Sequence, residues 1–128
     1  MKAADMLDAF GGDEVEKRLA LTKLMDAYGA LLTEKQAQQL SMTLNEDLSL
    51  SEIAEETGTS RQAVYDSVHR SCRQLCQAEE KLGFIAKRMD AAKKLSEISA
   101  LLEKGNADKA AAIVKEWKEK EEEDGYGV

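Results

Sequence analysis

Apolar residues recur every three or four positions along most of the chain, which is the spacing of one face of an α-helix. In the first such stretch the apolar positions are Val15, Leu19, Leu21, Leu24, Met25, Tyr28, Leu31 and Leu32. Gly29 interrupts good helix formers, which indicates either close helix packing or a weak point. Residues 1–12 show little periodicity, so we interpret them as a frayed or short helical lead.

Three segments have the pattern of a capping box, in which a Ser or Thr precedes a Glu or Gln by three positions. They begin at Thr33, Ser49 and Thr59. The first predicts a helix that ends near residues 45–47. The narrow buried face expected for this helix consists of Ala37, Leu40, Ser41 and Leu44.

The second and third boxes predict two helices joined by a very short turn. The first of the pair is expected from Ser51 to about Thr57, and Gly58 is expected to end it because glycine adopts a left-handed backbone at least cost. A helix then restarts within two or three residues. Helices separated by so short a turn cross at a large angle, so the pattern predicts a helix-turn-helix at about residues 49–82.

Beyond this turn, the apolar positions continue for longer than a small domain can cover. They are Val64, Val68, Cys72, Leu75, Leu82, Ile85, Met89 and Ala92, followed after a small phase shift by Leu95, Ile98, Leu101 and Leu102. Gly83 is expected to break or bend this helix, and Gly105 to end it. A last helix, about Ala107 to Glu122, carries Ala110, Ile113, Val114 and Trp117 on one side. The uncovered length of the stripe predicts pairing with a second copy, a homodimer.

These elements predict an all-α fold of five or six helices. Residues 13–83 form the expected helix-turn-helix domain, and residues 84–124 a helical C-terminal extension and candidate dimerisation segment. The chain has no proline and 5% aromatic residues, which fits a helical core of Leu, Ile, Val, Met and Ala. No apolar run approaches the roughly 20 residues of a membrane span, and the N-terminus lacks a signal peptide's apolar stretch. We therefore expect no membrane span and a cytoplasmic protein.

The helix after the tight turn presents a set of polar residues that suits DNA. Burying Val64 and Val68 turns the opposite face of that helix outward. The outward residues are Arg61, Gln62, Tyr65, Asp66 and His69. In a DNA-bound unit these positions enter the major groove, where guanidinium pairs with guanine and amide with adenine. Three serines at helix N-termini, Ser49, Ser51 and Ser60, are candidates for contacts with phosphates beside backbone amides.

Charge leaves a second interpretation open. The net charge is −7, and proteins that bind DNA through phosphate contacts are usually basic. Residues 60–77 contain three arginines and one aspartate, whereas the preceding helix carries three glutamates. A local basic surface is compatible with DNA but does not require it. The alternative is a protein-docking module on the same scaffold.

Three strings of sequence resemble the bacterial YlxM family. They are residues 28–36 (YGALLTEKQ), 48–54 (LSLSEIA) and 60–66 (SRQAVYD), and the resemblance covers about residues 14–90. It implies a helix-turn-helix similar to region 4 of sigma factors and a role in the signal recognition particle pathway. Components of that particle are then expected partners, and the alternative becomes an adaptor that docks on its GTPase or RNA without binding DNA. Thr59 and Ser67 stand where sigma-type units usually have apolar residues.

Catalytic and metal chemistry have little support. The chain has a single histidine, no recognisable nucleophile context and no glycine-rich phosphate loop, so we expect no enzyme and no cofactor. His69, Cys72 and Cys76 share one helical face, but a fourth ligand is not apparent and their spacing is unlike common zinc patterns. The favoured interpretation places Cys72 in the core and Cys76 at its edge, without a disulfide framework.

Overall fold

A computed structural model of the protein describes residues 13–125. Within this range the chain forms α-helices and short connections, without a strand, which confirms the all-α prediction. The elements are α2 (Glu14–Tyr28), the 3₁₀ turn η2 (Gly29–Leu31), α3 (Glu34–Asn45), α4 (Leu50–Thr57), α5 (Arg61–Leu82), α6 (Phe84–Glu103) and α7 (Ala107–Glu123). They divide into two units, one up to Ile85 and one from Ala86 onward. The predicted lead at residues 1–12 lies outside the described residues.

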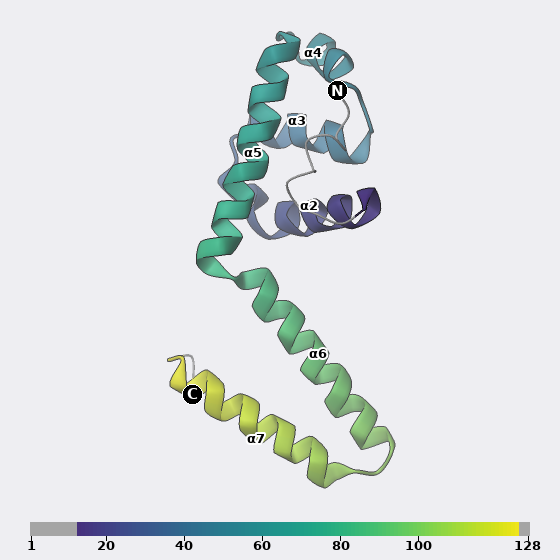
Figure 1. Ribbon diagram of the computed structural model, residues 1–128, viewed down its shortest axis with the longest axis vertical. Helices are drawn as coiled ribbons and strands as arrows, with labels where there is room; N and C mark the ends of the chain where they lie inside the picture. The colour runs from purple at the N-terminus through teal and green to yellow at the C-terminus, as the bar shows by residue number, and fades with distance from the viewer. Residues whose placement is uncertain (1–12, 126–128) are drawn as a thin grey trace. The chain divides into compact units, whose positions relative to one another are not determined.

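The first unit is built around α5, the longest helix. Helices α2, α3 and α4 each pack against it, and Figure 1 shows the three arranged along one side of α5. The buried residues of the described part of this core are Leu21, Leu24, Tyr28, Leu32, Leu40, Leu50, Ile53, Ala54, Val64, Val68, Cys72 and Leu75. Every residue that α5 contributes comes from its first four turns, so the helix is anchored along its N-terminal half and centre.

The apolar face of α2 is narrower than the sequence predicted. The helix ends at Tyr28, and Gly29 opens the 3₁₀ turn instead of lying within a continuous helix. Val15 is 74% exposed and Leu19 is 53% exposed, so their assignment to the buried stripe was wrong. At about 100° per residue, the face defined by Leu21 and Tyr28 leaves both side chains on other sides of the helix.

Two of the three predicted capping boxes are present. The Thr33 hydroxyl accepts a hydrogen bond from Gln36 N at 3.2 Å, and the Gln36 side chain accepts one from Thr33 N at 2.9 Å. Ser49 and Glu52 make the same reciprocal pair at the start of α4. These bonds satisfy amides that have no partner within the helix, which explains where α3 and α4 begin.

The third box is not formed, and the N-cap of α5 is Ser60. Its hydroxyl accepts from Ala63 N at 3.0 Å. Thr59 N donates to Ala54 O at 3.0 Å, so Thr59 still belongs to the closing turn of α4 and its amide is already bonded, which leaves Gln62 no N-cap amide with which to complete a box. The predicted cap was wrong by one residue, whereas the helix does restart within three residues of Gly58, as expected.

The buried face of α3 also differs from the expected set. Gln39, Leu40 and Thr43 are buried, whereas Ala37, Ser41 and Leu44 are only partly covered. The Thr43 hydroxyl donates to Gln39 O at 2.9 Å, which removes the cost of burying its polar atom. The side of α3 that meets α5 is therefore partly polar.

The end of α5 is fixed by Tyr28. Gly83 has a φ of 64°, a left-handed conformation that ends α5 at Leu82, so the expected break is present. The Tyr28 hydroxyl donates to Glu79 Oε1 at 2.6 Å and accepts from Phe84 N at 3.1 Å. Glu79 Oε1 also accepts from Ile85 N at 2.9 Å. Tyr28 and Glu79 thus bind the first amides of α6, which otherwise have no intrahelical partner.

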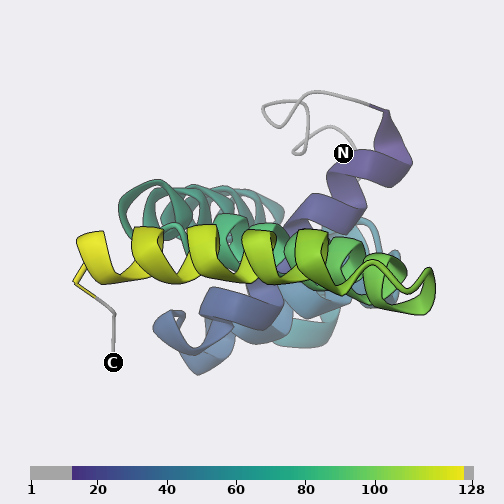
Figure 2. The same cartoon turned by 90° about the horizontal axis from the view of Figure 1, so that it is seen from below.

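The second unit is an antiparallel pair of helices. Figures 1 and 2 show α7 running back along α6 after the turn at Gly105, which has a φ of 78°. Asn106 caps α7 through Lys109 N, and Lys94 Nζ lies 5.3 Å from the centre of the Trp117 ring. Ala110 is the one residue buried in the described part of this unit. Among the described residues, no helix is both long enough and apolar enough to span a membrane.

Candidate nucleic-acid interface

The turn between α4 and α5 has the geometry of a helix-turn-helix. Gly58, with a φ of 67°, closes α4 through a hydrogen bond from its N–H to Ala54 O, and Ser60 caps α5 two residues later. Nothing lies within 4 Å of a Cβ built on Gly58, so the left-handed backbone, and not crowding, requires glycine there. Ile53 and Val64 are fully buried, so the crossing is closed by tight apolar packing.

The structure brings the five predicted reading residues onto the beginning of α5. Arg61, Gln62, Asp66 and His69 are exposed. Tyr65 is only half-buried, because its ring also packs against the core, and it stacks on His69 with ring centroids 5.9 Å apart. The set is therefore an exposed polar surface with one partly fixed aromatic ring.

Hydrogen bonding within this surface distinguishes its members. Gln62 Nε2 donates to Asp66 Oδ1 at 3.0 Å, which orients the Gln62 amide along the helix. Arg61 makes no ion pair within the described part of the chain, so its five N–H donors are available to a ligand. Arg61 is accordingly the member of the set best placed to form a bidentate contact.

A depression lies between the first turns of α4 and α5. Its volume is about 430 Å³, and it is lined by Leu50, Arg61, Gln62 and Tyr65. Leu50 was not among the predicted site residues, because an apolar residue just after a capping serine has the pattern of core. It is indeed buried, and its edge gives the depression an apolar floor beside the polar rim of α5.

The three predicted phosphate-contacting serines occupy two kinds of position. Ser49 and Ser60 are N-caps whose oxygens accept from Glu52 N and Ala63 N, while Ser51 is exposed in the first turn of α4. A hydroxyl that accepts from an amide still has its own hydrogen to donate. The capping role therefore leaves Ser49 and Ser60 able to donate to an anion at the helix ends.

The surroundings of the interface carry both signs of charge. Arg70 and Arg73 are exposed further along α5, and Glu52, Glu55 and Glu56 are exposed on α4. Cations on α5 attract phosphates, whereas the row of carboxylates on α4 repels them. The cations that the helix-turn-helix offers to phosphates therefore lie on α5 and not on α4.

The two cysteines have the environment of packed thiols. Burial, and then the neighbouring Cys76, raise the pKa of Cys72 to about 12, and burial raises the pKa of Cys76. Both are free, and the described residues contain no group of three or more histidine, cysteine or acidic side chains placed to hold a metal ion. A thiol held in its neutral form is a poor nucleophile and a poor metal ligand.

Comparison with known proteins places this architecture in a family. The model of the UPF0122 family, described as "Putative helix-turn-helix protein, YlxM / p13 like", matches residues 15–119. A UPF0122 protein of Clostridium perfringens is 50% identical over 76 residues, which cover 59% of this chain and 67% of the relative. UPF0122 proteins of Clostridium kluyveri and Desulforamulus reducens are each 41% identical, over 78% of this chain and 90% and 92% of their own lengths. With six α-helices in residues 13–125, a helix-turn-helix at α4–α5 and these matches, the chain belongs to the UPF0122 family of YlxM-like helix-turn-helix proteins.

Proposed function

We propose that the protein is a non-enzymatic helix-turn-helix regulator that binds DNA through the beginning of α5. The observation that carries the proposal is the exposed polar face of α5, where Arg61 and Gln62 directly follow the left-handed turn. In helix-turn-helix complexes the N-terminal residues of the second helix contact base edges in the major groove. Membership of a helix-turn-helix family supports the same use of α5.

Each member of the interface has a distinct role in this proposal. Arg61 donates to guanine, and Gln62 exchanges its bond to Asp66 for adenine. Tyr65 and His69 present a stacked pair of rings at the edge of the groove. The N-terminal serines of α4 and α5 donate to phosphates, which sets orientation and not sequence preference.

The resemblance to YlxM proteins supports a more specific setting. We propose that the regulator takes part in the signal recognition particle pathway in the cytoplasm and meets components of that particle. Its second unit, α6 and α7, is then available for a homodimer, which presents two copies of α5 to a two-fold site.

A second candidate function follows from the charge of the chain. The net charge of −7 and the exposed glutamates of α4 oppose the approach of nucleic acid to most of the surface. They favour an adaptor that uses the same helix-turn-helix to dock on the signal recognition particle's GTPase or RNA without binding DNA. The two candidates differ in whether Arg61 contacts bases.

Fluorescence anisotropy with duplexes selected from a random-sequence pool tests the first proposal. Arg61→Ala is expected to weaken binding to a selected duplex by about 1–3 kcal/mol, the value of one good bidentate contact. Arg73→Ala is the matched control, because Arg73 is exposed on the same helix three turns further on. Binding of the parent is also expected to fall steeply with salt.

Two results would overturn DNA reading by α5. One is a failure to select any duplex above the background of random DNA. The other is a selected duplex that binds Arg61→Ala and the parent equally well. Binding of the purified particle RNA or GTPase by the same protein would then favour the adaptor.

A further inference from the structure

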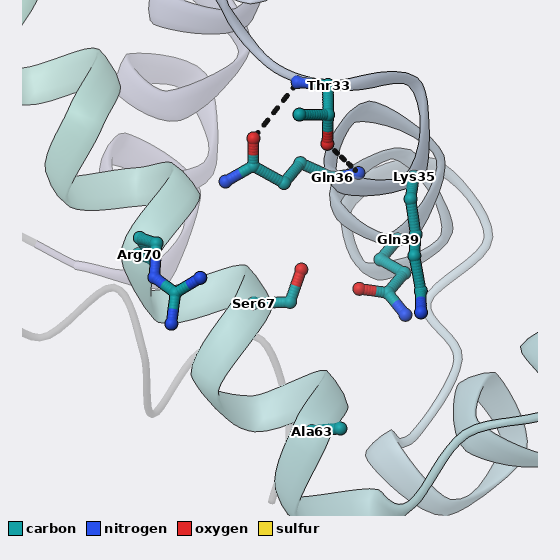
Figure 3. Close-up of a pocket in the computed structure, with 7 residues that line it drawn as sticks. All are labelled: Thr33, Lys35, Gln36, Gln39, Ala63, Ser67 and Arg70. Carbon is teal, nitrogen blue, oxygen red and sulfur yellow. Dashed lines mark hydrogen bonds between the residues drawn. The ribbon is translucent and has the colours of Figure 1, made fainter.

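A second cavity lies between α5 and α3. Its volume is about 350 Å³, within the range of about 300–1,000 Å³ typical of small-molecule sites. The lining residues are Thr33, Lys35, Gln36, Gln39, Ala63, Ser67 and Arg70. Figure 3 shows side chains from both helices facing this space, with the hydroxyl of Ser67 and the amide of Gln39 directed into it. None of the lining residues belongs to the predicted DNA-reading set, although Ala63, Ser67 and Arg70 are its neighbours along α5.

Gln39 places an unsatisfied acceptor at the inner wall of the cavity. The residue is 1% exposed, and its Oε1 is a buried atom without a hydrogen-bond partner. Such an atom costs about 1–3 kcal/mol of desolvation when nothing donates to it. A group that enters the cavity with an N–H or O–H would remove this cost.

The orientation of the Gln39 amide follows from its neighbour Thr57. The Thr57 hydroxyl donates its single hydrogen to Ile53 O at 2.7 Å, so the oxygen can only accept from another group. Gln39 Nε2 lies 3.5 Å from that oxygen and donates to it. The amide nitrogen is therefore directed toward Thr57, and the carbonyl oxygen is the atom left for a ligand in the cavity.

The rim of the cavity is cationic. Lys35 and Arg70 are both exposed, they come from different helices, and neither forms an ion pair within the described part of the chain. The seven lining residues include no acid, although the chain as a whole carries a net charge of −7. Two unpaired cations beside a polar cavity attract an anionic group, and phosphate suits both a lysine and an arginine.

We propose that the cavity between α3 and α5 binds a small phosphorylated molecule of the nucleoside monophosphate or sugar phosphate class. Its phosphate lies between Lys35 and Arg70, and a hydroxyl or amino group donates to Gln39 Oε1. Ser67 supplies a further hydroxyl to the same ligand. This assignment does not depend on DNA binding by α5, because none of the seven lining residues belongs to the predicted DNA-reading set.

Titration of the full-length, ¹⁵N-labelled protein tests the assignment. The probes are AMP, GMP and glucose 6-phosphate, with adenosine, glucose and inorganic phosphate at matched ionic strength as controls. At least one phosphorylated probe is expected to shift the side-chain amide resonances of Gln39 and the backbone amides of Lys35 and Ser67. The controls are expected to shift them weakly, because adenosine and glucose lack the phosphate, and inorganic phosphate lacks the sugar or nucleoside that would reach Gln39 while the phosphate lies between Lys35 and Arg70.

Two substitutions test separately the cation that binds the phosphate and the amide oxygen that accepts from the rest of the ligand. Arg70→Ala is expected to weaken binding at least about tenfold, the value of a hydrogen bond to a charged group, while Arg73→Ala leaves it unchanged. Gln39→Met keeps similar volume and removes the unsatisfied oxygen. It is expected to melt within a few degrees of the parent, or higher, and to bind the probe at least about tenfold more weakly.

The proposal is overturned if no phosphorylated probe perturbs Gln39 at millimolar concentration. It is also overturned if inorganic phosphate alone matches the best probe, or if Arg70→Ala and Arg73→Ala bind equally. Shifts at Lys35 and Arg70 that appear only with duplex DNA or RNA would assign the cations to a nucleic-acid backbone instead. That result would overturn the small-molecule site whether or not Arg61 reads bases.

Discussion

On α3, the position of a side chain on the helix decides whether it is buried, and its polarity does not. Gln39 and Thr43 are as buried as Leu40, although they belong to residue types that are usually exposed. Hydrophobic periodicity cannot identify such residues, because their burial depends on a helix far away in the sequence. For the same reason the cavity around Gln39 was not predicted, whereas the exposed reading residues of α5 followed from the phase of Val64.

Val64→Asp is expected to unfold the first unit. Val64 is fully buried between α4 and α5, so a carboxylate there has no compensating partner. Thermal melting followed by circular dichroism measures the effect. Ala63→Asp is the control, because Ala63 is the exposed neighbour and an acid in the first turn of a helix is favourable. A Val64→Asp protein that melts like Ala63→Asp would contradict the packing of α4 on α5.

Tyr28→Phe is expected to lower the melting temperature at neutral pH, because it leaves Phe84 N without its acceptor and Glu79 without its hydroxyl donor. Burial, and then the bond to Glu79, raise the pKa of Tyr28 above its usual value of 10.0. The native state therefore holds this proton more tightly than the unfolded chain does. Stability from this group is present below about pH 10 and is lost as the pH rises through the raised pKa.

Urea unfolding at pH 8 and pH 11 measures this dependence. The parent is expected to lose more stability between the two pH values than Tyr28→Phe does. Tyr65→Phe serves as the control, since no hydrogen bond of the Tyr65 hydroxyl is found in the described structure. Equal losses in the parent and in Tyr28→Phe would show that the hydroxyl does not couple α2 to the start of α6.

At the level of the secondary-structure elements, the sequence predicted the helix caps well where a single residue could act as the cap. It failed where two adjacent residues could both do so. The caps at Thr33 and Ser49 depend on residues three positions apart, so the sequence alone identified them. Thr59 and Ser60 are adjacent candidates for the N-cap of α5. Which of them caps the helix depends on how many residues the C-terminal turn of α4 includes. In the structure that turn includes Thr59, whose N–H donates to Ala54 O, and the sequence does not indicate this bond.

Ser60→Ala is expected to destabilise the first unit by about 1 kcal/mol through loss of the N-cap bond to Ala63 N. Thr59→Ala is expected to have a smaller effect, because its backbone bond to Ala54 O is kept. Chemical denaturation of both variants gives the comparison. The reverse order would mean that Thr59 caps α5 after all.

On the scale of the whole molecule, the two units differ in how well they bury apolar surface. The first unit has a continuous core, whereas the described part of the second buries Ala110 alone. Met89, Leu95, Leu102 and Val114 are each about half exposed. The sequence indicated this surplus through a stripe too long for one small domain, and the exposed apolar residues of α6 and α7 are the part that the described chain leaves uncovered.

A second copy of the chain is the expected partner, because α6 and α7 form a pair of helices too small to hold a core and two such pairs make a four-helix arrangement. Light scattering of the full chain at micromolar concentration is expected to give twice the monomer mass of 14.1 kDa. Joint substitution of Leu95→Glu and Leu102→Glu is expected to return the protein to a monomer without loss of the first unit's helicity. Leu19→Glu, at an exposed apolar position of α2, is expected to leave the dimer intact. A parent near 14.1 kDa, or dissociation by Leu19→Glu alone, would show that α6 is not the dimer interface.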